Sequence, residues 1–377
     1  MPIEFEKTVK YAKILSPLKN FEEDTITFEY RADPLTGRNT TVIKAMLNYV
    51  SRFLASDAEL LNSLVEKTKA NCPFCPESVR SKTPMFPQEF LAEGRICVGD
   101  AVVVPNLLGH AEQSVLVILS REHHLKLKDF TPKLLLDGFK GGVEYLKRLS
   151  EVDVSVRFPV FVFNYLTPAG SSIFHPHMQI LARDRPFHLV NLLMDKSKAY
   201  YEKHHTSYWH DLVIKEKNAE RYLFEINGVE WFVPFAPLRG LNEAQAIVKG
   251  KSNLKELSNG EWLGLAEGIA KILKFYHSQG YMSFNIILMS GPLDENLDYF
   301  DVNMRIMSRP GTQQFCFTDA WAVPYLLWDG EAVEEPEHSS KKLERQQKFN
   351  ISKTKIETAN AEPIVSRLSS IHISCFI

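Results

Sequence analysis

The chain has no long hydrophobic run, few cysteines and almost no net charge. None of its apolar stretches approaches the roughly 18 residues that a membrane-spanning helix needs, so a membrane protein is not expected. It has five cysteines in 377 residues. Cys97, Cys316 and Cys375 show no framework spacing, and this scarcity fits a reducing compartment. The formal net charge of −2 gives no reason to expect bulk nucleic-acid binding.

The remaining composition is that of an ordinary globular protein. Hydrophobic residues make up 45% and charged residues 24% of the chain, which is enough apolar material for a packed core. A length of 377 residues exceeds the usual span of one hydrophobic core, so two lobes are expected. The first residues, Met-Pro-Ile-Glu, do not resemble a signal peptide, and we therefore expect a cytoplasmic location.

The most informative motif is the run His-Pro-His-Met-Gln at residues 175–179. In an extended strand, side chains two residues apart share a face, which predicts that His175, His177 and Gln179 point the same way. Imidazole can act as a nucleophile, a general base or a metal ligand near neutral pH. The alternative interpretation is a surface strand with two incidental histidines.

A second motif is the cysteine pair Cys72 and Cys75, in the run Cys-Pro-Phe-Cys. The C-x-x-C spacing lets two thiolates bind one tetrahedral metal ion, and Zn²⁺ accepts mixed cysteine and histidine ligands. A redox pair is the alternative, but the surroundings do not resemble the strand-to-helix setting of thioredoxin-like proteins. His175 could be a third ligand. A fourth could come from the turn after the apolar run 114–119, where His123 is the candidate, although an exposed turn is an alternative interpretation.

Together these motifs resemble the galactose-1-phosphate uridylyltransferase branch of the histidine-triad superfamily. That branch carries a CPFC-type cysteine pair, a histidine in an S-x-[DE]-H setting and an H-P-H-x-Q strand. Further matches are the run Arg-Ala-Asp-Pro-Leu-Thr-Gly at 31–37, Pro105-Asn106, and the spacing within residues 164–179. The resemblance is strong over residues 31–186, weaker over 222–309 and absent beyond.

The resemblance implies a role for each motif residue. His177 would attack the α-phosphorus of a nucleoside diphosphate sugar and form a nucleotidyl-histidine, with a backbone carbonyl, commonly that of His175, holding the proton on its other nitrogen. Gln179 would donate hydrogen bonds to the phosphate oxygens. The implied nucleotide-binding residues are Asn106, Asn164, Gly170, Ser172 and Gln179.

The same resemblance implies a structural Zn²⁺ bound by Cys72, Cys75, His123 and His175. His124 is the alternative ligand, and the S-x-E-H register favours His123. Relatives carry an H-x-H pair for a second metal where this chain has Asp-Val-Asn at 301–303, so a second metal site is expected to be absent.

Hydrophobic periodicity predicts the elements around these motifs. A helix is expected over 41–69, which departs from the strand that the family has there. Strands are expected at 101–104, 114–119, 160–164 and 177–182, with a helix at 133–150 between the second and third. This order is typical of an antiparallel sheet backed by helices. A hairpin at 222–226 and 230–234, a helix at 258–278 and strands at 283–289 and 301–307 follow.

The predicted fold class is therefore α+β. The resemblance implies two histidine-triad-like repeats in one pseudo-symmetric body, with the catalytic strand and zinc site in residues 1–190 and a degenerate repeat in 191–329. From residue 330 onward the chain is acidic or of mixed charge, and residues 330–377 are expected to form a mobile tail.

Three functions remain open at this level. The first is a UDP-glucose:hexose-1-phosphate uridylyltransferase of galactose metabolism, which the HPH-x-Q form and the cysteines favour. The second is a nucleotidyl phosphorylase that splits ADP-glucose, a dinucleoside polyphosphate or adenylyl sulfate. The third is a non-catalytic nucleotide-binding protein. The expected partners are a nucleotide sugar and a sugar phosphate, without nucleic acid or membrane, and a homodimer is compatible with the resemblance.

Overall fold

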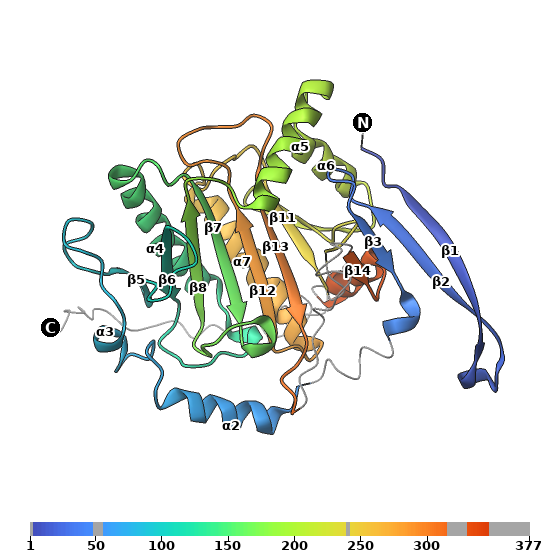
Figure 1. Cartoon of the computed structure of the whole chain (residues 1–377), viewed down its shortest axis with the longest axis horizontal. Helices are drawn as coiled ribbons and strands as arrows, with labels where there is room; N and C mark the ends of the chain where they lie inside the picture. Colours follow the sequence, from blue (N-terminus) through green and yellow to red (C-terminus); the bar gives the residue numbers. More distant parts are fainter. Residues whose placement is uncertain (1–2, 48–55, 239–241, 315–329, 347–377) are drawn as a thin grey trace, which may run out of the picture.

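A ten-stranded antiparallel sheet runs through the protein (Figure 1). The computed structural model describes residues 3–47, 56–238, 242–314 and 330–346. Each strand of this sheet pairs antiparallel with its neighbours. The strands follow one another across the sheet as β4 (Ile96–Val98), β5 (Ala101–Pro105), β6 (Gln113–Ile118), β8 (His177–Arg183), β7 (Phe158–Tyr165), β12 (Ser283–Met289), β13 (Val302–Arg309), β11 (Ala244–Val248), β10 (Val229–Phe232) and β9 (Tyr222–Ile226).

Two long helices, α4 (Pro132–Val152) and α7 (Asn259–Ser278), cover one face of this sheet (Figure 1). Ser258 begins α7 with a capping box, since its side chain and that of Glu261 satisfy each other's backbone N–H groups. Both helices approach the strands closely. A Cβ on Gly142 of α4 would lie 2.6 Å from the Phe161 ring, and one on Gly268 of α7 would overlap the Trp231 indole. Glycine at these points lets helix and sheet share one core.

The described residues cover only part of the opposite face. The helices α5 (His188–His204) and α6 (Tyr208–Lys217) pack their apolar residues against strands that include β10, β11 and β12. A separate apolar cluster around Phe74, Leu116 and Ile118 lies over β5 and β6. The strands β8 and β7 lie between these regions, and β8 carries His177 and Gln179 on this face.

A second sheet has the order β1 (Lys7–Ser16), β2 (Glu22–Ala32), β3 (Asn39–Val42) and β14 (Gly330–Ala332). The β1–β2 hairpin extends away from the body (Figure 1). The helix predicted over 41–69 is wrong at its start, because β3 pairs with β2 and β14 and buries Thr40 and Val42 alternately. The helix α2 (Ala58–Lys69) occupies the end of that range, and residues 48–55 lie outside the described residues.

Residues 330–346 are packed on the body and do not form the mobile tail that their charge predicts. After β14, residues 336–346 are helical. Glu337 accepts hydrogen bonds of 3.0 and 2.8 Å from the buried Arg31 guanidinium and one of 2.9 Å from Arg221. Burial opposes ionisation there, but these bonds lower the pKa of Glu337 to about 2. Leu343 joins the main core. Residues 347–377 lie outside the described residues.

The other elements predicted around the motifs are confirmed within a few residues at each end, and so is the α+β class with antiparallel sheets and helices. Asn227 and Gly228 have φ of 50° and 82°, as a tight two-residue hairpin turn requires. The remaining short helices are η1 (Pro17–Lys19), η2 (Lys44–Met46), α3 (Val79–Lys82), η4 (Leu127–Asp129) and η5 (Thr167–Ala169).

Candidate metal centre and active-site strand

Cys72, Cys75, His123 and His175 meet in one buried cluster. The cysteines lie between α2 and α3, His123 follows β6, and His175 precedes β8. Their four ligand atoms lie within 4.8 Å of one another. Cys75 Sγ is 3.5 Å from His123 Nδ1 and 3.7 Å from His175 Nδ1, and Cys72 Sγ is 3.8 Å from His175 Nδ1. Around a tetrahedral Zn²⁺, neighbouring sulfur and nitrogen ligands are about 3.5 Å apart, so the cluster has the size of a zinc site.

Hydrogen bonds outside the cluster orient both imidazoles. His175 Nε2 lies 2.7 Å from the carbonyl oxygen of Ser120, to which it can only donate, so Nδ1 keeps its lone pair for the cluster. His123 Nε2 lies 3.0 Å from Thr68 Oγ1. The Thr68 hydroxyl donates its own hydrogen to the Leu64 carbonyl, so it accepts from His123. Such outer partners are typical of histidines that bind metals.

Burial shifts the protonation of the cluster. It lowers the pKa of His175 to about 4 and also lowers the pKa of His123, so both imidazoles are neutral near pH 7. Burial, together with the charge of Cys72, raises the pKa of the Cys75 thiol to about 12. Two neutral imidazoles and two sulfur ligands form a donor set that Zn²⁺ accepts, and a divalent cation would stabilise the thiolates. This cluster could bind zinc.

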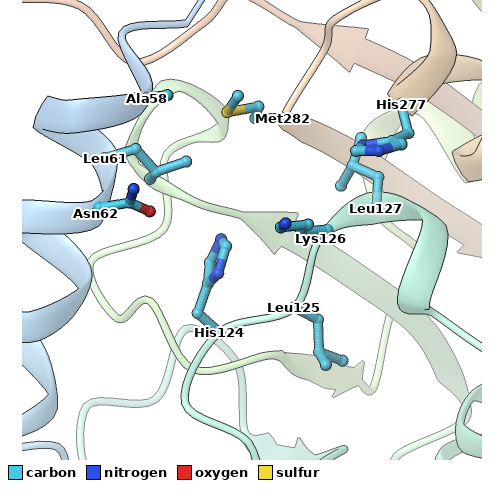
Figure 2. A pocket seen from close by; sticks show the side chains of 9 residues that line it. All are labelled: Ala58, Leu61, Asn62, His124, Leu125, Lys126, Leu127, His277 and Met282. Atoms are coloured by element: carbon cyan, nitrogen blue, oxygen red, sulfur yellow. The ribbon is translucent and has the colours of Figure 1, made fainter.

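His124, the alternative ligand, lies outside the cluster. Its ring stacks on Tyr165 with centroids 6.2 Å apart. Figure 2 shows the ring in a pocket between α2 and the segment that leads into η4, with Leu61, Asn62, Lys126, His277 and Met282 among its neighbours. The structure therefore brings His123, and not His124, to the two cysteines.

His177 is the first residue of β8, and a hydrogen bond sets its tautomer. Its Nδ1 lies 2.8 Å from the carbonyl oxygen of His175, so Nδ1–H donates and Nε2 carries the lone pair. Burial lowers the pKa of His177, although the bond to His175 acts in the opposite direction. The Phe74 ring packs edge-on against the imidazole, with centroids 5.1 Å apart. A neutral imidazole with an available Nε2 lone pair can act as a nucleophile.

Gln179 and Asn164 lie on the same face of the sheet as His177. Gln179 pairs with Leu116 of β6 and Val162 of β7. Asn164 follows Val162 by two residues and His177 precedes Gln179 by two, so strand alternation places all three side chains on one face. His175 lies in the turn before the strand, and its side chain reaches the cysteines instead of sharing that face.

The other residues implied for the nucleotide have mixed surroundings. Asn106 is half-buried just after β5, and its amide is 3.3 Å from both Ser114 Oγ and the Leu108 backbone nitrogen. The Gly170 N–H already donates to the Thr167 carbonyl at 2.9 Å. Ser172 is exposed. The roles implied for these residues remain predictions.

The motif analysis did not identify Asn285 of β12, which pairs with Asn164 across the sheet. Its Nδ2 donates to Asn164 Oδ1 at 2.6 Å and to the Ala169 carbonyl at 2.8 Å. Its Oδ1 accepts from Arg309 at 2.6 Å. The one available signal was a polar residue within the apolar run 283–289.

Where relatives carry their second metal pair, this chain has Asp301, which is buried, and burial raises its pKa to about 7. Asn303 Nδ2 donates to the Asp301 backbone carbonyl at 3.0 Å. The absence of a second metal remains a prediction. Within the described part of the chain, no helix has both the length and the apolar character that crossing a membrane requires.

No protein-family model matches the chain. An uncharacterized protein of Archaeoglobus fulgidus is 30% identical over 332 residues, covering 88% of this chain and 94% of that protein. Among solved structures, an ADP-glucose phosphorylase from Arabidopsis thaliana with bound ADP-glucose has a TM-score of 0.66 at 18% identity, covering 84% of this chain and 98% of that one.

Two further structures have the same architecture. A GalT-like protein from Arabidopsis thaliana has a TM-score of 0.63 at 18% identity and covers 84% of this chain and 98% of its own. A uridylyltransferase mutant has a TM-score of 0.61 at 20% identity and covers 85% of this chain and 98% of its own. At these identities the likeness concerns the fold.

Proposed function

Because this chain belongs to the family of the Archaeoglobus fulgidus protein and has the fold of GalT-like proteins of the histidine-triad superfamily, we propose that it transfers a nucleotidyl group through His177. The observation that carries this proposal is the hydrogen bond from His177 Nδ1 to the His175 carbonyl. It leaves the Nε2 lone pair as the nucleophile beside half-buried Gln179.

The proposed reaction has two displacements. In the first, Nε2 of His177 attacks the α-phosphorus of a nucleoside diphosphate sugar. A nitrogen–phosphorus bond forms, the bond to the bridging oxygen breaks, and the sugar 1-phosphate leaves with that electron pair. In the second, a phosphate oxygen of the acceptor attacks the same phosphorus and releases the imidazole. The proton stays on Nδ1 throughout, hydrogen-bonded to the His175 carbonyl. The sugar 1-phosphate leaves as an anion and needs no proton from His177.

The surrounding residues have supporting roles in this proposal. Gln179 donates to the oxygens of the transferred phosphoryl group, where charge develops. The Gly170 amide and Ser172 assist Gln179 at the phosphate oxygens. Asn164 and Asn106 orient the nucleoside. The apolar cluster of Phe74, Leu116 and Ile118 lies next to His177 and offers a surface for the base.

Zinc has a structural role in this proposal. Bound by Cys72, Cys75, His123 and His175, it would connect the cysteine loop to the turn that precedes β8. The His175 backbone would then be held where its carbonyl accepts the hydrogen bond from His177 Nδ1–H.

The proposed architecture is two histidine-triad-like repeats, and the strand orders support it. The strands β4, β5, β6, β8 and β7 lie in this order across one half, with α4 between β6 and β7 in the chain. In the other half, β9, β10, β11, β13 and β12 lie in the corresponding order, with α7 between β11 and β12. The halves meet where β7 pairs with β12.

The proposed donor is UDP-glucose and the proposed acceptor a hexose 1-phosphate, on the strength of the HPH-x-Q strand and the cysteine pair. Phosphorolysis of ADP-glucose is the second candidate, favoured by the fold likeness to the plant ADP-glucose phosphorylase. Both reactions use the same imidazole and differ in base and acceptor.

Trapping the covalent intermediate tests the proposal. Protein is incubated with donor labelled in the α-phosphate (UDP-glucose, ADP-glucose or diadenosine tetraphosphate), and acid-labile, base-stable label is mapped by peptide analysis. Label on His177 from UDP-glucose is expected. Label from only an adenine donor would instead identify a phosphorylase. Absence of label from all three donors would contradict the transfer mechanism and favour a nucleotide-binding protein.

Two assignments accompany this proposal. The first is a homodimer, for which sedimentation should give twice the mass of one chain. The second is a cytoplasmic location, for which the native protein should be recovered in the cytosolic fraction.

A further inference from the structure

A chain of hydrogen bonds crosses from the second half of the sheet to the site in the first half. Arg309, the last residue of β13, donates to Asn285 Oδ1 at 2.6 Å. Asn285 in turn donates to Asn164 Oδ1 at 2.6 Å and to the Ala169 carbonyl at 2.8 Å. Asn285 and Asn164 face each other as a register pair of β12 and β7, and all three side chains are half-buried.

The chemistry of the partners fixes the orientation of each amide. A guanidinium has only donors, so the group that Asn285 turns toward Arg309 must be its oxygen. The Asn285 nitrogen then faces the Asn164 amide and the Ala169 carbonyl. Because the Ala169 carbonyl can only accept, its contact with Asn285 requires the same amide orientation as the contact with Arg309. Asn164 consequently turns Oδ1 toward Asn285, and its Nδ2 remains as the group for another partner.

The position of that nitrogen relates it to the reactive imidazole. Asn164 lies on β7 and His177 on the neighbouring strand β8, on the same face. Arg309 lies on β13, three strands from β8, which at about 4.8 Å per strand is about 14 Å. Arg309 is thus too distant to act on phosphorus at His177, but it can act through Asn285.

We infer that Arg309 and Asn285 are positioning residues, which hold Asn164 so that its amide nitrogen donates to an acceptor oxygen of the nucleotide bound at His177. The inference rests on the proposed function. It assigns to the second half of the chain a part in nucleotide binding, through amide orientation and without contact with the reacting atoms.

Asn285→Asp is the most direct variant. The carboxylate still accepts from Arg309 but cannot donate, so Asn164 must rotate, donate to it and present Oδ1 to the nucleotide. Arg309→Met removes only the outer donor and leaves the Ala169 carbonyl to orient Asn285. Arg309→Lys retains a donor and should keep the nucleotide affinity near that of the wild type. Arg157→Gln is the matched control, since Arg157 pairs with the exposed Asp294.

The experiment measures UMP and AMP affinity of the full chain by calorimetry, each variant being made in the wild-type and Asn164→Ala backgrounds. In the wild-type background, Asn285→Asp is expected to weaken the tighter nucleotide about tenfold and Arg309→Met about threefold. In the Asn164→Ala background neither is expected to change the affinity, because the group they orient is gone. Arg157→Gln should have no effect in either background.

Equal weakening in both backgrounds, or no weakening in the wild-type background, would overturn the inference. A purely structural role would lower the melting temperature and affect both backgrounds alike. Labelling of His177 is a separate measurement. Wild-type protein that binds nucleotide without ever becoming labelled would contradict the proposed transfer, while the affinity pattern would still decide the role of Asn285 and Arg309.

Discussion

The imidazole of His177 donates its Nδ1 proton to the backbone carbonyl of His175, at 2.8 Å, while the imidazole of His175 faces Cys72 and Cys75. His175 thus contributes its side chain to the cysteine–histidine cluster and its backbone carbonyl to the hydrogen bond that sets the tautomer of His177. Any change that moves His175 should alter both.

Replacing the nucleophile tests the central chemistry. His177→Asn should reduce turnover by at least about a thousandfold, since the group that forms the covalent bond is gone. The fold and equilibrium nucleotide binding should change little. Gln179→Ala should slow transfer less, because it removes a stabilising donor and leaves the attacking nitrogen. Turnover within tenfold of wild type in His177→Asn would contradict the mechanism.

Metal analysis tests the cluster. Purified protein should contain about one Zn²⁺ per chain. Cys72→Ser should lower the zinc content and destabilise the fold on the order of several kcal/mol, because the free energy of metal binding contributes to folding. Cys97→Ser is the matched control, since Cys97 is exposed and outside the cluster. Stoichiometric zinc in a Cys72→Ser/Cys75→Ser variant would place the metal elsewhere.

Neighbouring histidines provide a sharper comparison. His123→Ala should lose zinc, since His123 Nδ1 lies 3.5 Å from Cys75 Sγ. His124→Ala should retain zinc, because its ring stacks on Tyr165 outside the cluster. Atomic absorption after dialysis against a weak chelator measures both. The reverse pattern would show that His124 is the ligand.

The lowered pKa of His177 predicts a pH dependence. The single-turnover labelling rate should stay level as pH falls through about 6.5, where an ordinary histidine would be half protonated.

The lowered pKa of His177 also predicts how the free energy of unfolding changes with pH. Below about pH 6.5 His177 is protonated in the unfolded chain but stays neutral in the folded protein. The wild type should therefore lose stability relative to His177→Asn as pH falls. Denaturant unfolding at pH 7.5 and 5.5 measures this difference, and an equal loss in both proteins would contradict it.

A covalent intermediate also predicts the kinetic order. Varying one substrate at fixed levels of the other should give parallel double-reciprocal lines. Label should exchange between nucleotide sugar and sugar phosphate without an acceptor. Intersecting lines together with no exchange would require direct transfer between the two substrates.

Local patterns were sufficient for the elements that carry the site. The C-x-x-C spacing, the alternating strand 177–182 and the amphipathic helices 133–150 and 258–278 are encoded in adjacent residues, and all appear in the structure. Residue types and the C-x-x-C spacing made Cys72, Cys75 and His175 candidate ligands, and the family resemblance added His123 to complete the set. The choice of His123 over His124 followed from motif register, and the structure agrees with it.

Pairing between segments determines the features that local patterns did not predict. Residues 39–42 form a strand because β2, which precedes them in the chain, and β14, which begins only at Gly330, supply its hydrogen bonds. Periodicity within the segment does not report such partners. Residues 330–346 pack on the body, where Arg31 and Arg221 bind Glu337, a charge pairing that composition does not reveal.

The pairing of Asn285 with Asn164 depends on the register between strands from the two halves of the chain. By itself the sequence determined which side chains are candidates for the proposed chemistry, because a candidate nucleophile and candidate metal ligands follow from residue type and local spacing. The tertiary structure alone decided which amides and charges orient them, because those contacts form only when distant strands align.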